Sequence, residues 1–265
     1  MEVAYYKKLF QTIGNIIELI EKDDIPKYLL FLENAFPYMD NYNYHKGMNG
    51  IIQELTGLLK TKNIGTDSDR ALLLDFQATL ETKPEKAIKL EKDALAQIET
   101  ITADNARLVS NLHANLGGLY RMNGHPDLAR EHMEKSISLL DQFNLLHIND
   151  SIPQIANYAM FLTEQQEPER GISELQKLSG IIKEYHSDDC LDYAKVQETL
   201  GTIYLMTANL PQAKTHFKRA FKIYEKIWAD EPEMIEAKYQ EIQELYPQIG
   251  FSIGKTLSGL LTKQT

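Results

Sequence analysis

Asn115 and Asn157 have side chains suited to binding a peptide, and they lie 42 residues apart. A side-chain amide offers a hydrogen-bond donor and an acceptor, which is the pair that a peptide backbone requires. Asparagines at one position of successive structural units would form a ladder along an extended ligand. The alternative interpretation is that both asparagines are polar residues on a solvated helix face.

Further polar residues fall on the same predicted helix faces, which would line a groove. A helical wheel adds Asn111, Arg121, Thr163, Lys195, Glu198, Thr202, Gln240, Glu241 and Glu244 to this groove. Arg121 is suited to pairing with a ligand carboxylate. The three glutamates would make the C-terminal end of the groove acidic. Taken singly, each of these residues is more simply explained by a solvated polar surface.

The sequence shows no spacing of residues that is typical of a catalytic site or a metal site. The histidines have no metal-ligand spacing, since His125 and His132 lie two helical turns apart. The acidic residues Asp188 and Asp189 disfavour a nucleophilic role for Cys190. The stretch 250–256 has one residue too few between its glycines for a phosphate-binding loop. We therefore expect no enzyme activity, no cofactor and no metal.

The elements that carry the candidate residues repeat with a period of 42 residues. Prolines recur at this step, as do apolar and small residues. The members are Pro84, Pro126 and Pro168; Leu74, Leu116, Tyr158, Leu200 and Ile242; and Ala87, Ala129, Gly171 and Ala213. A fixed period of this length is typical of a repeat array, which presents an extended binding surface.

Composition and net charge limit the classes of partner that we expect this chain to bind. The chain has 265 residues and a net charge of -10. We see no Lys/Arg cluster of the kind that binds nucleic acid, and we expect no binding to nucleic acid or to a membrane. The single cysteine excludes an intramolecular disulfide, and neither a signal peptide nor a membrane span is evident. We expect a cytoplasmic protein.

Two units resemble the tetratricopeptide repeat, whose pattern is Leu-Gly-x-x-Tyr followed by Ala-x-x-x-Phe-x-x-Ala. The matching residues are Leu116, Gly117, Tyr120 and Ala129 in one unit and Leu200, Gly201, Tyr204, Ala213, Phe217 and Ala220 in the other. The resemblance implies an all-α fold, an α/α right-handed superhelix of helix pairs, here called helix A and helix B. It also implies that asparagine at the Asn115 position contacts peptides.

The units differ from the common form of this repeat. Their length of 42 residues resembles the extended repeats of kinesin light chain and of the peptide-sensing domains of bacterial quorum-sensing regulators. Asp75 replaces the glycine in the unit at Leu74. We expect Gly117 and Gly201 to allow helix B to approach helix A closely, and helix B to begin near the proline.

Both ends of the chain depart from the period. Residues 1–65 are predicted as an N-terminal helical cap or degenerate repeat, with helices near 3–22, 26–38 and 46–61. The array follows over 66–248, with units beginning near 68, 110, 152, 194 and 236. Linkers are expected at 102–109, 145–152, 187–193 and 229–235. The last segment, 249–265, carries an apolar stripe and is predicted to cap the array, or alternatively to contact a second copy.

These patterns favour a non-catalytic module that binds a peptide or protein segment in a concave groove. One alternative is a sensor of a signalling peptide that lacks a DNA-binding domain. Another is a structural or oligomerisation subunit without an extended ligand. A polar, open groove favours the first two functions, whereas a groove filled by the protein's own helix or by a second copy favours assembly.

Overall fold

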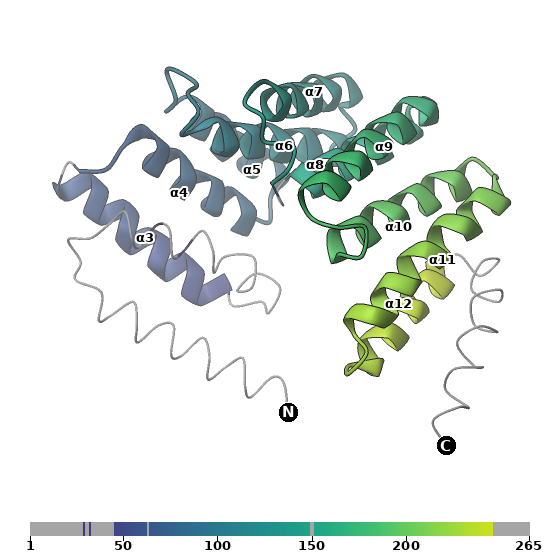
Figure 1. Ribbon diagram of the computed structural model, residues 1–265. Coiled ribbons are helices and arrows are strands. Elements are labelled where there is room, and N and C mark those ends of the chain that lie inside the picture. Colours follow the sequence, from purple (N-terminus) through teal and green to yellow (C-terminus); the bar gives the residue numbers. More distant parts are fainter. Residues whose placement is uncertain (1–28, 30–31, 33–44, 63, 149–150, 246–265) are drawn as a thin grey trace. The chain divides into compact units, whose positions relative to one another are not determined.

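The computed structural model describes residues 45–62, 64–148 and 151–245, together with Leu29 and Leu32. Over these three ranges the chain forms ten α-helices and no strand (Figure 1). They are α3 (His45–Lys62), α4 (Asp67–Leu80), α5 (Pro84–Leu95), α6 (Ala106–Met122), α7 (Pro126–Gln142), α8 (Ser151–Glu164), α9 (Pro168–Tyr185), α10 (Leu191–Met206), α11 (Leu210–Ile227) and α12 (Pro232–Leu245). The predicted all-α fold class is confirmed.

Proline marks the start of the second helix of each pair, as predicted. Pro84, Pro126 and Pro168 are the first residues of α5, α7 and α9, and Pro211 lies in the first turn of α11. The first turn of a helix tolerates proline because the missing N–H has no partner within the helix. Each proline therefore ends the short turn between helix A and helix B at a defined residue.

Polar side chains fix the starts of two helix A elements. Thr66 and Asp69 form a reciprocal capping box at α4, in which each side chain accepts a hydrogen bond from the other's backbone N–H. At α10 the Cys190 thiol caps the helix by accepting from the backbone N–H of Tyr193. The lone cysteine thus has a structural role at a helix end.

The chain divides into two compact units, residues 1–139 and 140–265. In the first, α3 packs on α4, α4 on α5, and α5 on α6. In the second, α8 packs on α9, both of them pack on α10, and α10 packs along α11. Sequential pairing of this kind is how a repeat array buries its apolar faces.

The 42-residue period corresponds to the buried faces of these pairs. Leu116, Tyr158, Leu200 and Ile242 are buried, while Leu74 is partly buried. The small residues of helix B, which are Ala87, Ala129, Gly171 and Ala213, are all buried. The periodic positions therefore hold helix A against helix B.

Glycine permits the closest helix contacts. A Cβ on Gly117 would lie 2.5 Å from Cγ of Met133 and 3.3 Å from the backbone oxygen of Ala129. A Cβ on Gly201 would lie 3.0 Å from the ring of Phe217. The expected close approach at both glycines is confirmed, although at Gly201 the neighbour is an aromatic ring.

The linkers differ from their predicted bounds. The segments between one pair and the next are 96–105, 143–150, 186–190 and 228–231. All four predicted linkers therefore extend too far, into the first turn or so of the helix that follows. Part of the extra length of the repeat lies instead in helix B, because α7, α9 and α11 have 17, 18 and 18 residues.

Several predictions concern residues outside this described part. They are the helices at 3–22 and 26–38, the stretch 250–256, and the terminal helix within 249–265 with its capping or oligomerisation role. The third N-terminal helix, predicted near 46–61, corresponds to α3. Among the described helices, none is both long and apolar enough to cross a membrane.

Two glycines of α9 give a matched test of the packing. A Cβ on Gly171 would lie 2.6 Å from the backbone oxygen of Ala159, whereas one on Gly180 would meet no atom within 4 Å. We expect Gly171→Ala to lower the free energy of unfolding by about 1–3 kcal/mol, because two backbones must separate. Gly180→Ala should raise it by up to about 1 kcal/mol through helix propensity. Urea denaturation of both variants measures this, and equal effects would contradict the packing.

Candidate functional site

The first candidate, Asn115 on α6, is engaged within the protein. Its side-chain Nδ2 donates a hydrogen bond of 2.8 Å to Oδ1 of Asp75 on α4. Its amide also interacts with the carboxyl of Glu91 on α5. Asn115 therefore links three helices of the first unit, although part of its surface remains exposed.

The two partners of Asn115, Asp75 and Glu91, are one period away from a small and a large residue of the pair α6–α7. Asp75 lies 42 residues before Gly117, and Glu91 lies 42 residues before Met133. In the pair α6–α7 these two positions hold Gly117 and Met133, which pack together. In the pair α4–α5 the same positions hold two carboxyl groups that form a hydrogen bond. Asp75 is 9% exposed and Glu91 is 1% exposed. Oε2 of Glu91 has no hydrogen-bond partner among the described residues.

Burial dominates the electrostatics of this carboxyl pair. Removal from water, and then the adjacent Asp75 carboxyl, raise the pKa of Glu91 far above its usual range. Glu91 therefore keeps its proton near neutral pH and shares it with Asp75 through their hydrogen bond. Asn115 supplies a neutral donor to Asp75. The cluster of Asp75, Glu91 and Asn115 is consistent with one shared proton in place of an apolar contact.

Glu198 of the second unit is engaged in a similar way. It accepts a hydrogen bond of 2.6 Å from the Tyr224 hydroxyl and forms an ion pair of 2.8 Å with Nζ of Lys238. Glu198 thus ties α10 to α11 and α12. Burial, and then the Glu198 carboxylate, raise the pKa of Tyr224. Burial opposes the charge of Lys238, but Glu198 and Glu241 together raise its pKa. Lys238 therefore keeps its charge and holds α12 to α10.

Two further candidates donate to their own helices. The Thr163 hydroxyl, in a residue that is 9% exposed, donates to the backbone oxygen of Ala159. The Thr202 hydroxyl donates to the backbone oxygen of Glu198. Such back-bonding satisfies a hydroxyl on a helix without a ligand. Asn111 and Arg121, both on α6, are half-buried.

Asn157 and Lys195 remain open to a partner. Asn157 on α8 is exposed, and its side chain has no hydrogen-bond partner in the described part of the chain. Lys195 on the adjacent α10 is exposed and lies 4.0 Å from Asp192 in a marginal ion pair. An amide and an ammonium on two packed helices can bind a peptide carbonyl, a backbone N–H or a carboxylate.

Sequence spacing did not reveal the pairing of histidines across helices. His113 on α6 and His132 on α7 contact each other through their Nδ1 atoms, 2.9 Å apart, so one ring donates and the other accepts. Burial, followed by His132, lowers the pKa of His113 to about 4. A stacked Tyr120 covers His132. Two neutral rings in this setting form a packing contact.

A similar arrangement recurs 84 residues later, which is two periods. The His216 ring nitrogen Nδ1 lies 2.9 Å from Oε1 of Gln197, the residue at the position of His113, and the ring stacks on Tyr204. The tyrosine of the repeat and a helix-B histidine are thus partners in both units. The signal was present in the sequence as a shared step of 84 between His132 and His216. Among the described residues, no three potential ligand side chains converge on a metal position.

A row of lysines on α11 also escaped the sequence reasoning. Lys214, Lys218 and Lys222 lie one helical turn apart, and Lys226 continues the row with an ion pair to Asp189. Lys218 and Lys222 are exposed, and Lys214 is half-buried. The expectation from the sequence concerned only clusters of the kind that binds nucleic acid and did not single out this row. The i, i+4 spacing of the lysines could have revealed it.

Comparison with family models finds a match over one part of the chain. Residues 151–226 match the family model of the tetratricopeptide repeat. These residues run from the start of α8 into α11. No curated protein sequence matches the chain.

Solved structures with tetratricopeptide-like repeats share the fold. Nearly identical repeats of this kind from Podosopora anserina, in a protein described as a kinesin light chain, are 14% identical to this chain with a TM-score of 0.57. The match covers 74% of this chain and 93% of that one. BtubC (BKLC) from P. vanneervenii is 15% identical with a TM-score of 0.56, over 90% and 92% of the two chains. The likeness extends to the fold of stacked helix pairs.

The carboxyl cluster predicts a dependence of stability on pH. An unfolded glutamate loses its proton above about pH 4.3, whereas the folded chain retains the Glu91 proton to a higher pH. The stabilisation by this proton is therefore complete below the unfolded pKa and is lost as pH rises toward the folded pKa. Relative to Glu91→Gln, the wild type should lose up to about 1.4 kcal/mol of unfolding free energy per pH unit.

Urea denaturation between about pH 5 and pH 9 measures this difference in slope. Glu85→Gln, on the exposed side of the same helix, is the matched control and should follow the wild type. Parallel curves for the wild type and Glu91→Gln would show that Glu91 is ionised in the folded protein.

Proposed function

We propose that this chain of tetratricopeptide repeats is a non-catalytic module that binds a peptide or a segment of a partner protein. Proteins of this repeat fold act in protein interactions, because stacked helix pairs create an extended surface without a closed active site. The finer proposal concerns which part of that surface contacts the ligand. We assign it to the exposed face of α8 and α10.

The availability of Asn157 carries this proposal. A ligand gains most from polar groups that are exposed and not already bonded, since no internal hydrogen bond must break. Asn157 meets that condition, and Lys195 on the neighbouring helix adds a positive charge. The two side chains would bind a peptide amide and a nearby carboxylate.

The sequence favoured Asn115 as a ligand contact, but we propose that it supports the fold. Its donor group is engaged by Asp75, and a ligand that required it would break that bond. We therefore reduce the two-asparagine ladder to Asn157 and treat Asn115 as a support of the fold. Glu198 and Thr202 are likewise supports, because their side chains bond within the second unit.

The two asparagines provide the test. Peptides selected from a random display library on the wild type would be titrated by calorimetry. Asn157→Ala should weaken a selected peptide by about tenfold or more, since a lost hydrogen bond that leaves a buried group unpaired costs about 1–3 kcal/mol. Its melting temperature should stay unchanged, because the side chain is exposed.

Asn115→Ala should show the reverse pattern. Its free energy of unfolding should fall by about 1–3 kcal/mol, because Asp75 loses a donor while buried. Lys218→Ala on the basic row of α11 is the control for another surface and should leave peptide affinity unchanged. Full affinity in Asn157→Ala, or loss of affinity in Lys218→Ala alone, would overturn the assignment.

The experiment also separates the rival functions. A sensor of a signalling peptide would select a narrow set of related sequences from the library. An assembly subunit would select none and would elute as an oligomer in size-exclusion chromatography with light scattering. Deletion of 249–265 would then test whether the terminal segment carries that contact.

A further inference from the structure

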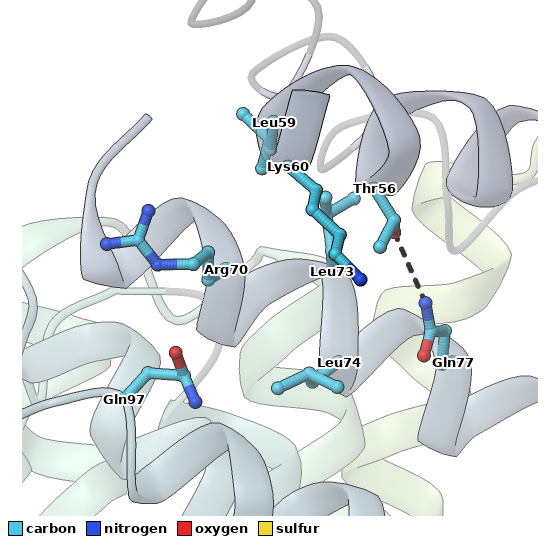
Figure 2. A pocket seen from close by; sticks show the side chains of 8 residues that line it. All are labelled: Thr56, Leu59, Lys60, Arg70, Leu73, Leu74, Gln77 and Gln97. Carbon is cyan, nitrogen blue, oxygen red and sulfur yellow. Dashed lines mark hydrogen bonds between the residues drawn. The ribbon is translucent and has the colours of Figure 1, made fainter. Parts of the chain in front are cut away.

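A cavity of about 450 Å³ lies in the first unit beside α3 and α4 (Figure 2). Its described lining consists of Thr56, Leu59, Lys60, Arg70, Leu73, Leu74, Gln77 and Gln97. A volume of this size falls within the range of about 300–1,000 Å³ that holds small molecules in proteins. None of these lining residues is among the candidate groove residues, so the cavity is distinct from the proposed peptide surface.

Three leucines form an apolar wall. Leu59 comes from α3, whereas Leu73 and Leu74 come from adjacent positions of α4. Leu59 and Leu73 belong to the same buried cluster as Met48 and Ile52. The wall is therefore backed by the core of the unit, and an apolar group placed against it would be removed from water.

The rest of the described lining is polar and includes no acidic side chain. In a chain with 38 acidic and 28 basic residues, the described lining contains two cations and no carboxylate. Arg70 is partly neutralised by Asp67, and its guanidinium also donates to the backbone oxygen of Gly65. Lys60 forms no ion pair among the described residues, so its ammonium group is the available charge.

The polar groups lie around the leucines. Figure 2 shows Lys60 extending over Leu73, with the Gln77 amide and the Thr56 hydroxyl close by. Nε2 of Gln77 donates a bond of 3.3 Å to Oγ1 of Thr56, which joins α3 to α4 across the cavity edge. Nε2 of Gln97, on the other side of the leucines, donates to a backbone oxygen of α5. These internal bonds orient the two amides before any ligand arrives.

We propose that this cavity binds a small amphipathic carboxylate, with its hydrocarbon tail on the leucine wall and its carboxylate on the Lys60 ammonium. The tail would pack mainly on Leu74, which is partly exposed, because Leu59 and Leu73 are 5% and 2% exposed. The anionic head would gain a charge-assisted hydrogen bond from Lys60, which is stronger than one between neutral groups. The Gln77 amide at the same edge contributes a polar neighbour for the second carboxylate oxygen.

This inference stands independently of the proposed peptide binding. The cavity is built from α3, α4 and the segment after α5, whereas Asn157 and Lys195 lie on α8 and α10. Failure of one therefore leaves the other unaffected. The ligand class is a free medium-chain carboxylic acid, and the cavity is small enough to exclude a folded partner.

Three eight-carbon compounds that differ in their polar head group test the proposal. Octanoate, octanol and octylamine would be titrated into the full-length protein by calorimetry. We expect octanoate to bind about tenfold more tightly than octanol, because a charge-assisted hydrogen bond is about twice as strong as a neutral one. Octylamine should bind less tightly than octanol. Equal affinities for octanoate and octanol, or tighter binding of octylamine, would overturn the proposal.

A matched pair of lysine variants locates the charge. Lys60→Met keeps an unbranched apolar side chain, shorter by the charged Nζ, and should lower octanoate affinity about tenfold while leaving octanol binding unchanged. Lys86→Met, on the exposed side of α5, should bind octanoate as the wild type does. Unchanged octanoate binding by Lys60→Met contradicts the assigned role of that lysine.

Leucine methyl resonances report the tail. In protein labelled at leucine methyl groups, octanoate should shift the signals of Leu59, Leu73 and Leu74, while Leu200 in the second unit stays constant. This measurement does not depend on any variant folding. Shifts confined to other leucines would place the acid elsewhere and overturn the cavity assignment.

Discussion

Close packing between the two helices of each pair governs the positions of the other residues. At one position of helix A a small residue allows a large residue of helix B to approach, as Gly117 does for Met133 and Gly201 for Phe217. The position recurs every 42 residues because each pair must solve the same packing problem. Loss of the small residue would separate the helices and open apolar surface to water. Proline at the start of helix B fixes where the second helix begins, and so fixes which residues meet.

In the pair α4–α5 a hydrogen bond between two carboxyl groups replaces the contact between a small and a large residue. Asp75 and Glu91 replace the glycine and its large neighbour, and they avoid two buried charges by sharing a proton. A buried carboxyl also needs donors, which explains why Asn115 of the next helix A turns to Asp75. A residue whose type and spacing suited a peptide is thereby used to join neighbouring pairs. The same logic applies to Glu198, whose carboxylate binds Tyr224 and Lys238 on two other helices.

We assign ligand binding to polar groups that are exposed and not hydrogen-bonded within the described part of the chain. Asn157 is exposed on α8, Lys195 on α10, and Lys218 and Lys222 on α11. The cavity beside α3 and α4 differs from these surfaces, because two of its leucines are part of the core while Lys60 lies at its edge. A repeat array can thus hold several chemically different sites, each set by the residues of one or two pairs.

The period, the all-α class, the proline starts of helix B and the tight contacts at Gly117 and Gly201 could all be predicted without a structure. These follow from local rules: a repeat must place equivalent residues at equivalent depths, and proline and glycine act through their own backbone and size. Which polar residues bond within the protein depends on how the helices pack, and the sequence did not reveal it. Asn115 and Asn157 occupy the same position of the period, yet one is bonded to Asp75 and the other has no internal partner among the described residues. The difference arises from Asp75 and Glu91, which lie 40 and 24 residues before Asn115 and meet it only after the helices pack.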